Sequence, residues 1–195
     1  MAKRQTPICD FGWKAVDFDL LGVDGKRWSL DKCRGAMGLQ VMFICNHCPY
    51  VKAIRSSLIK DVKALNRMGV GVVAINSNDP SRYPEDSFPY MKSVASQFNY
   101  NFPYLLDDNQ AVAKEYKAIC TPDFFGFNAS MELQYRGRLD NTGAREKSDA
   151  PRELVMAMRQ VALTGQGPRQ QNPSIGCSIK SVSYTHLTLP TICSV

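Results

Sequence analysis

Two nearly continuous apolar runs, at residues 38–44 and 70–75, dominate the hydrophobic pattern of the chain. Runs of this kind are typical of strands buried on both faces of a largely parallel sheet. The apolar positions between the two runs recur at helical spacing: Val51, Ile54, Leu58, Val62 and Leu65. Pro49, which suits the first turn of a helix, precedes them, and Gly69 follows them. The pattern predicts a strand, a helix ending near Arg67, and a second strand.

Further short elements are predicted on both sides of this unit. Alternating residues 16–20, the Asp24-Gly25 turn and residues 27–29 predict an opening hairpin. The other predictions are a loop at 76–86, a helix at 88–98, a strand at 102–106, a helix at 109–118, an antiparallel pair at 123–127 and 132–136, and a helix at 152–163. We therefore expect one α/β domain whose central mixed β-sheet is flanked by helices on both faces, with an N-terminal hairpin extension.

The C-terminal part of the chain has a different character. We place the folded domain at residues 1–164 and expect an extended segment at 165–180, which begins with a stretch rich in Gly, Gln and Pro. Residues 181–195 contain no Asp, Glu, Lys or Arg, and the stretch at 182–187 resembles a translated sequencing-library adapter. We expect residues 181–195 to be a non-native tail and give no functional role to His186 or Cys193.

Composition and charge favour an ordinary globular protein over a nucleic-acid-binding or membrane protein. Apolar residues make up 44% of the chain and charged residues 22%, as in ordinary globular proteins. The formal charge of +6 is scattered over 195 residues without a long basic run, so we expect no nucleic-acid partner. No stretch approaches the roughly 18 apolar residues of a membrane span, and no apolar core of a secretion signal follows Lys3-Arg4. We expect a cytoplasmic protein without a membrane partner.

The main candidate chemistry is the C-x-x-C pair Cys45 and Cys48, placed between the first buried strand and its helix. The free N–H groups of a helix N-terminus stabilise a thiolate and lower its pKa. We expect Cys45 to attack a substrate disulfide and Cys48 to resolve the mixed disulfide. An imidazolium at His47 would favour the thiolate further. This chemistry requires that the two sulfurs can bond and that a substrate can reach one of them.

Two alternatives for the pair are a structural zinc site and two inert buried thiols. Structural zinc takes four ligands, commonly as two pairs. Outside residues 181–195 the sequence has no second C-x-x-C and no histidine other than His47, so we expect no metal site. We also expect no cofactor.

Thr121-Pro122 is the second informative position because it directly precedes a predicted strand. An X-Pro bond there can be cis and can leave a backbone edge free for a partner chain, although a trans bond is the default.

A family resemblance joins these two positions. The motifs Cys45-Asn46-His47-Cys48-Pro49-Tyr50-Val51-Lys52 and Cys120-Thr121-Pro122-Asp123-Phe124-Phe125 resemble the peroxiredoxin-like (AhpC/TSA-type) branch of the thioredoxin superfamily. The resemblance extends over nearly all of the chain except residues 181–195. It implies a thioredoxin-like fold, a redox-active C-x-x-C and a cis bond at Pro122 beside it. It also places Cys120 near the pair, either as a third redox thiol that modulates it or as a packed residue.

The remaining cysteines of the chain before residue 181 are Cys9, Cys33 and Cys177. Each lacks a partner residue at a spacing typical of a redox or metal-binding motif, so we expect structural or incidental roles for them.

Three functions remain open at this point. The first is a thiol-disulfide oxidoreductase that exchanges disulfides through Cys45 and Cys48, binds a protein or small-molecule disulfide along Thr121-Pro122, and is reduced by a cellular thiol. The second is an antioxidant thiol peroxidase that uses Cys48. It ranks lower, because in the family pattern P-x-x-x-T-x-x-C the threonine position is Cys45 here and the proline position is Val41. The third is a redox sensor without enzymatic turnover.

Overall fold

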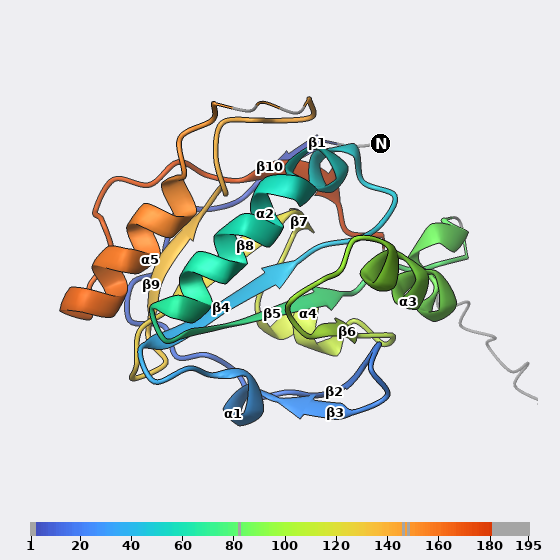
Figure 1. The fold of residues 1–195 in the computed structure, drawn as a ribbon, viewed down its shortest axis with the longest axis horizontal. Helices are drawn as coiled ribbons and strands as arrows, with labels where there is room; N and C mark the ends of the chain where they lie inside the picture. Colours follow the sequence, from blue (N-terminus) through green and yellow to red (C-terminus); the bar gives the residue numbers. More distant parts are fainter. Residues whose placement is uncertain (1–2, 82, 146, 148, 181–195) are drawn as a thin grey trace, which may run out of the picture.

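The computed structural model describes residues 3–81, 83–145, 147 and 149–180, and its main element is a seven-stranded mixed β-sheet (Figure 1). The strand order is β3-β2-β6-β5-β4-β8-β9. In chain order these strands are β2 (Asp19–Gly22), β3 (Arg27–Ser29), β4 (Gly38–Phe43), β5 (Val70–Asn76), β6 (Tyr104–Leu106), β8 (Asp123–Phe127) and β9 (Leu133–Gly137). The predicted mixed sheet and the N-terminal hairpin, formed by β2 and β3, are both confirmed.

Strand β4 lies inside the sheet and is buried along its whole length. It pairs in parallel with β5 and antiparallel with β8. Its side chains alternate between two cores: Leu39, Val41 and Phe43 pack on one face, and Met42 packs on the other. The continuous apolar run of the sequence thus corresponds to a strand covered on both sides.

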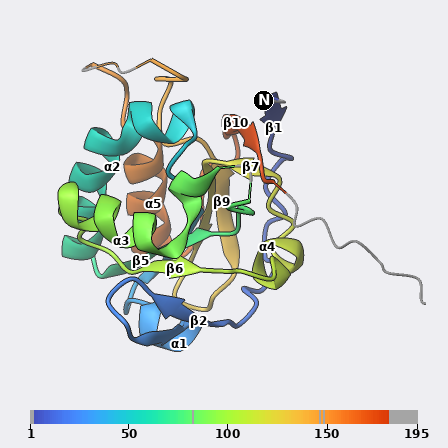
Figure 2. The same cartoon turned by 90° about the vertical axis from the view of Figure 1, so that its right-hand side faces the viewer.

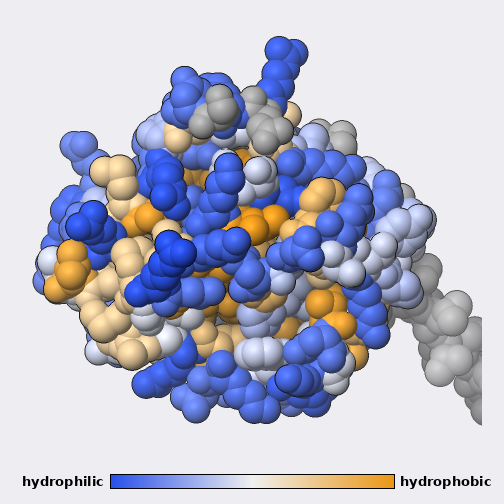
Figure 3. Space-filling model, in the orientation of Figure 1, coloured by the Kyte–Doolittle hydropathy of each residue, from blue (hydrophilic) through white to orange (hydrophobic). Residues whose placement is uncertain are grey.

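Helices cover both faces of the sheet (Figures 1 and 2). The long helix α2 (Pro49–Arg67) packs with α3 (Phe88–Gln97) and α5 (Glu153–Thr164) into the core on one face. The short helices α1 (Leu30–Cys33) and α4 (Ala111–Glu115) contribute to the core on the other face. Hydrophilic side chains are interspersed with apolar ones over α2 and α5 (Figure 3), and on α5 the apolar Met156 and Leu163 are exposed.

A second, three-stranded sheet has the order β1-β10-β7. It is made of β1 (Lys3–Gln5), β7 (Cys120–Thr121) and β10 (Ile175–Ser178), which come from distant parts of the chain. Strand β10 runs antiparallel to both neighbours. The segment expected only to be extended therefore contains a paired strand. Four residues including Gly176 carry too weak a local pattern to predict it.

Three local boundaries differ from the sequence prediction. Residues 14–16 bond to other parts of the chain instead of joining the hairpin: Ala15 N donates to Met131 O, and Tyr116 Oη donates to Val16 O. The first hairpin strand consequently begins at Asp19. The helix expected at 109–118 covers only Ala111–Glu115, and α1, which Ser29 caps, was not predicted.

Two further expectations concern the C-terminal tail and membrane-spanning helices. The suspected non-native tail, residues 181–195, lies outside the described residues. Among the described residues, no helix is both long and apolar enough to cross a membrane.

Candidate functional site

Cys45 and Cys48 lie in the connection between β4 and α2. Cys48 is the N-cap residue of α2, and Pro49 is the first residue of that helix. The Cys45 and Cys48 thiols are in hydrogen-bonding contact with each other. The six cysteines that the structure describes are not joined in disulfides. The two sulfurs are therefore neighbours in the reduced state, as a pair that forms a disulfide requires.

The electrostatic surroundings favour a thiolate at Cys48. The hydrogen bond from the Cys45 thiol lowers the pKa of Cys48 to about 5, and the Val51 backbone N–H, in the first turn of α2, acts in the same direction. Burial, the neighbouring Cys48 sulfur and the Asp86 carboxylate raise the pKa of Cys45 well above its ordinary value. In this structure the surroundings lower the pKa of Cys48 rather than that of Cys45, where the sequence placed it, mainly because the Cys45 thiol donates to the Cys48 sulfur.

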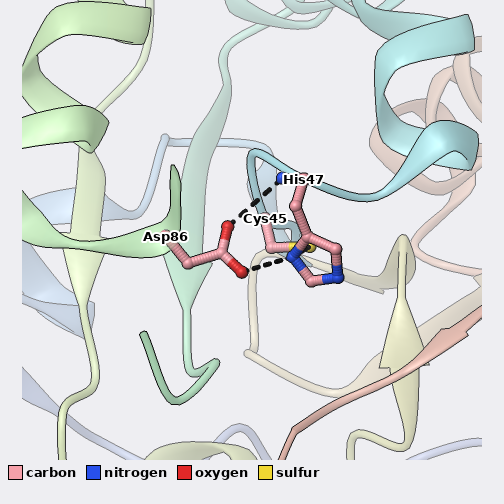
Figure 4. A group of neighbouring side chains, drawn as sticks. All are labelled: Cys45, His47 and Asp86. Carbon is pink, nitrogen blue, oxygen red and sulfur yellow. Dashed lines mark hydrogen bonds and ion pairs between the residues drawn. The ribbon is translucent and has the colours of Figure 1, made fainter. Parts of the chain in front are cut away.

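His47 connects Cys45 to a buried carboxylate (Figure 4). Its Nδ1 atom lies 2.5 Å from Asp86 Oδ2 and 3.6 Å from Cys45 Sγ. The imidazole also stacks on Tyr83, with ring centroids 3.9 Å apart. The result is a buried cluster of three groups, Cys45, His47 and Asp86, in which the Nδ1 atom lies between the thiol and the carboxylate.

Asp86 holds the C-x-x-C loop through its backbone as well. It comes from the short helix η1 (Pro84–Asp86), and its Oδ1 atom accepts hydrogen bonds from Asn46 N at 2.7 Å and His47 N at 3.3 Å. Asn78 Nδ2 donates to the other carboxylate oxygen at 3.2 Å. Sequence analysis missed Asp86 because it lies in a polar segment predicted as a loop, and no local signal distinguishes it from the other acidic residues there.

The Thr121–Pro122 peptide bond is cis and lies directly beside the two cysteines. Thr121 Oγ1 is 3.2 Å from Cys45 Sγ, and the Cys48 thiol donates to Thr121 O at 3.1 Å. The cis bond and its position agree with what the family resemblance implied.

The backbone edge at Thr121 is not free. Strand β10 pairs with it, with Cys177 opposite Thr121 and Ser178 opposite Cys120. The approach is close, because a Cβ added at Gly176 would collide with the Thr121 carbonyl oxygen. In this conformation the chain itself occupies the expected docking edge, so a partner strand can bind at Thr121-Pro122 only if β10 moves.

Strand β10 also brings Cys177 to the site. The Cys177 thiol is in hydrogen-bonding contact with Cys48. Cys177 was expected to be structural or incidental, and the structure places it in contact with the pair. No sequence signal could reveal it, because it depends on the pairing of β10 with β7.

Cys120 occupies a different position from the one that a third redox thiol would need. Its neighbour Thr121 directs its side chain toward Cys45, and successive side chains of a strand point to opposite faces. The Cys120 sulfur approaches Pro122 O at 3.7 Å. Burial raises the pKa of the Cys120 thiol far above its ordinary value. The structure thus fits a packed residue.

Access to the pair is closed in this structure. The exposed fraction is 1% for Cys45 and 0% for Cys48. The requirement that a substrate can reach one sulfur is therefore not met without movement of a covering element. A cavity of about 190 Å³ lies nearby, lined among others by Tyr50, Pro122 and Ile175. It adjoins both the start of α2 and β10.

The cluster of Cys45, His47 and Asp86 also raises the question of a metal. Among the described residues, these three place potential ligand atoms within 4.8 Å of one another. They could supply three ligands of a tetrahedral ion, whereas a structural zinc takes four. His47 Nδ1 is already hydrogen-bonded to Asp86, so the arrangement fits a hydrogen-bonded cluster better than a closed metal site.

Comparison with known proteins places this site in a family. A family model described as AhpC/TSA matches residues 11–138. No protein with a curated description matches the chain. The chain is 41% identical to an uncharacterized conserved protein from Geobacillus kaustophilus of known structure; the TM-score is 0.87, and the match covers 93% of this chain and 97% of that one.

Two further structures extend the comparison. A hypothetical protein from Sinorhizobium meliloti is 36% identical, with a TM-score of 0.85, and the match covers 92% of this chain and 98% of that one. The thioredoxin domain of a thiol-disulfide oxidoreductase from Bacteroides vulgatus is 16% identical, with a TM-score of 0.54, over 65% of this chain and 86% of that one. The last match shows the thioredoxin-like fold alone. With the family match, which covers more than half of its length, the chain belongs to the AhpC/TSA family and has a thioredoxin-like fold.

Proposed function

We propose that the protein is a thiol-disulfide oxidoreductase that works through Cys45 and Cys48. The observation that supports this most strongly is the contact between the two thiols at the start of α2, where Cys48 has a pKa lowered to about 5. A thiolate is the nucleophile of thiol-disulfide exchange, and the lowered pKa favours this form of Cys48, in which its sulfur accepts from Cys45 and no longer donates to Thr121 O. A redox role also agrees with membership of the AhpC/TSA family.

In the proposed reaction the Cys48 thiolate attacks a substrate disulfide. A Cys48–substrate S–S bond forms, and the other substrate sulfur leaves as a thiolate. Cys45 then attacks the Cys48 sulfur, which forms the Cys45–Cys48 disulfide and releases the second substrate thiolate. The substrate gains two electrons, and the cysteine pair loses two. A cellular thiol, as expected for a cytoplasmic protein, reduces the pair again.

His47 and Asp86 support the second step by holding the loop and the ring beside Cys45. The raised pKa of Cys45 keeps this thiol protonated, and its proton passes to the departing substrate thiolate as Cys45 attacks. His47 Nδ1 lies 3.6 Å from the Cys45 sulfur, and its hydrogen bond to Asp86 Oδ2 orients the ring there. His47 and Asp86 are positioning residues for resolution.

Exchange also requires an opening over the site. Strand β10 covers the edge at Thr121, so we expect a disulfide substrate to enter when this strand separates from β7. Thr121 and Pro122 would then present their backbone to the substrate strand, as β-strand addition requires.

Trapping with oxidised glutathione tests the proposal. The Cys45→Ser/Cys177→Ser variant keeps Cys48 and removes both neighbouring thiols. We expect a stable glutathione adduct on tryptic peptide 35–52, which contains Cys48 and follows Arg34. The matched Cys48→Ser variant, which keeps Cys45 in the same peptide, should form at least tenfold less adduct. Equal labelling of both variants, or none in either, contradicts the proposal.

A thiol peroxidase is the second candidate, and one specific observation favours it. Cys48 lies at the family's peroxidatic position, its pKa is lowered to about 5, and Cys45 donates to it from the position of the family's threonine. Hydrogen peroxide should then convert Cys48 to a sulfenic acid that a dimedone reagent traps in the Cys45→Ser/Cys177→Ser variant. A reaction no faster than that of free cysteine removes this candidate. Reversible oxidation without turnover of either substrate would point to a redox sensor.

A further inference from the structure

We propose that Cys177 is a second resolving thiol, which forms an intramolecular disulfide with Cys48 as an alternative to the Cys45–Cys48 bond. The proposal deepens the proposed function and rests on its first step, the attack of Cys48 on a disulfide. It gives a role to a thiol that the C-x-x-C mechanism leaves unused.

The register of β10 places the Cys177 side chain at the site. Cys177 is directly opposite Thr121 in the antiparallel pair. Directly opposite residues direct their side chains to the same face of a sheet, a few ångströms apart. The Thr121 side chain points at Cys45, with 3.2 Å between Oγ1 and Sγ. Cys177 therefore faces the C-x-x-C loop as well.

Cys48 lies between the two other thiols. Its sulfur is 3.1 Å from Thr121 O, the carbonyl of the residue paired with Cys177. The Cys48 side chain contacts both the Cys45 and the Cys177 thiols, and all three are buried in one core cluster. Cys177 is 3% exposed. One nucleophile thus has two neighbouring thiols, one from its own loop and one from β10.

Pairing on both sides fixes Cys177 in this position. On its other edge, β10 pairs with β1, where Lys3 lies opposite Cys177. Beyond the strand, Ile179 N donates to Ile119 O, and Lys180 N donates to Asn78 Oδ1 at 2.8 Å. Asn78 is also a partner of Asp86, so the end of β10 and the C-x-x-C loop share one hydrogen-bond network.

The proposed step balances as an exchange. After Cys48 has formed a mixed disulfide with the substrate, the Cys177 sulfur attacks the Cys48 sulfur. The Cys48–Cys177 bond forms, the Cys48–substrate bond breaks, and the proton of Cys177 passes to the departing substrate thiolate. Two cysteines are oxidised, and the substrate disulfide is reduced to two thiols.

The two disulfides would have different consequences for the molecule. The Cys45–Cys48 bond lies within one loop and leaves β10 able to separate from β7. The Cys48–Cys177 bond ties the start of α2 to β10 and so holds the covering strand over Thr121. Resolution by Cys177 would close the site until a thiol reductant opens it.

Peptide mapping after treatment with oxidised glutathione tests the proposal in the Cys45→Ser variant. Trypsin separates Cys48, in peptide 35–52, from Cys177, in peptide 170–180. We expect a disulfide-linked pair of these peptides, and at least tenfold less glutathione adduct on 35–52 than in the Cys45→Ser/Cys177→Ser variant. The Cys45→Ser/Cys120→Ser variant is the control and should form the same link.

The outcomes separate this inference from the proposed function. An adduct of equal size in the single and double variants, without the peptide link, overturns the role of Cys177 and leaves exchange at Cys48 standing. If glutathione labels neither variant, the proposed function fails. In that case the thiol oxidant diamide tests the Cys48–Cys177 disulfide directly. A link between the two peptides after diamide treatment supports the disulfide, and no link overturns it.

Discussion

The Cys48 thiol differs from the other described thiols in what surrounds it. It is the N-cap residue of α2 and has the Cys45 and Cys177 thiols as neighbours. Burial has the opposite effect at two other cysteines: it raises the pKa of Cys33 and of Cys9 to about 12, at Cys9 despite hydrogen bonds from Gln171 and Arg136. Hydrogen bonding to the charged form outweighs desolvation at Cys48, whereas desolvation prevails at the other two.

The first prediction concerns how the ionisation of the Cys48 thiol depends on pH. The pKa of Cys48 is lowered from its ordinary value of 9.0 to about 5 in the folded chain. Ionisation of Cys48 therefore stabilises the fold fully at pH values above 9, and this contribution is lost as the pH falls toward 5. The thiolate absorbance in the ultraviolet, measured as wild type minus Cys48→Ser, should show a step with its midpoint near pH 5.

Two variants test whether the hydrogen bond from Cys45 is what lowers the pKa of Cys48. Cys45→Ala removes the strongest donor to the Cys48 sulfur and should move the midpoint to higher pH. Cys33→Ala, on the opposite face of the sheet, should leave it unchanged. A midpoint near 9 in the wild type would contradict the surroundings described for Cys48.

The second prediction concerns Asp86. In Asp86→Asn the side-chain oxygen can still accept from the Asn46 and His47 backbone N–H groups, but the charge next to the imidazole is lost. A hydrogen bond to a charged group is worth about 1.5–3 kcal/mol. In a Cys177→Ser background, resolution of the Cys48 mixed disulfide by Cys45 should slow roughly tenfold or more, as followed by stopped-flow release of glutathione.

The step before resolution provides the control. Formation of the mixed disulfide depends on Cys48 and should keep its rate in Asp86→Asn. If both steps slow equally, Asp86 has only a structural role in holding the loop.

At the scale of elements, the site consists of one predicted unit and one strand that closes it. The unit of β4, the C-x-x-C loop and α2 follows from local patterns in the sequence. Strand β10 does not, although it covers Thr121 and delivers Cys177. The close approach of its backbone at Gly176 to Thr121 is possible only without a side chain at that position.

The third prediction uses this close approach. In Gly176→Ala the new Cβ collides with the Thr121 carbonyl oxygen, so β10 must move away from β7. Separation of these strands should expose the site, and alkylation of Cys48 by iodoacetamide should become at least severalfold faster. Ser178→Ala, in the same strand but without added bulk, is the matched control. Unchanged alkylation in a folded Gly176→Ala variant would show that β10 does not control access.

At the scale of the whole molecule, two cores on opposite faces of one sheet hold the site in place. The core that includes the C-x-x-C cysteines is formed largely by α2, α5 and the facing side chains of the sheet. Arg152, at the start of α5, bonds Asp61 of α2 with 2.6 Å between Nε and Oδ1. The long helix that carries Cys48 at its N-cap is thus fixed by packing along its length rather than at the site itself.

The fourth prediction tests this packing. Leu58, in the middle of α2, is 1% exposed, and Leu58→Ala should lower the free energy of unfolding by about 2–5 kcal/mol through the cavity that it leaves. Leu163→Ala, at a residue of α5 that is 74% exposed, should change it by less than about 0.5 kcal/mol. Urea unfolding followed by circular dichroism measures both. Similar losses for the two variants would contradict the burial described here.

The sequence by itself determined those features that depend on neighbouring positions. Hydrophobic periodicity predicted β4, α2 and β5, because buried strands and amphipathic helices each need a characteristic spacing of apolar residues. The spacing of Cys45 and Cys48, directly before Pro49, placed a thiol pair at a helix start. The family resemblance added the cis bond at Pro122, which no local pattern fixes.

Only the tertiary structure decided which distant groups meet the pair. Asp86 and Cys177 lie far from Cys48 in sequence and reach it through η1 and through the register of β10 on β7. It also decided which of the two thiols has the lowered pKa, because the direction of the N–H groups and the order of the neighbouring thiols depend on coordinates rather than on spacing. The pKa of Cys48 and its disulfide partner depend on contacts between residues far apart in the sequence, and such contacts produce no periodic pattern of residues.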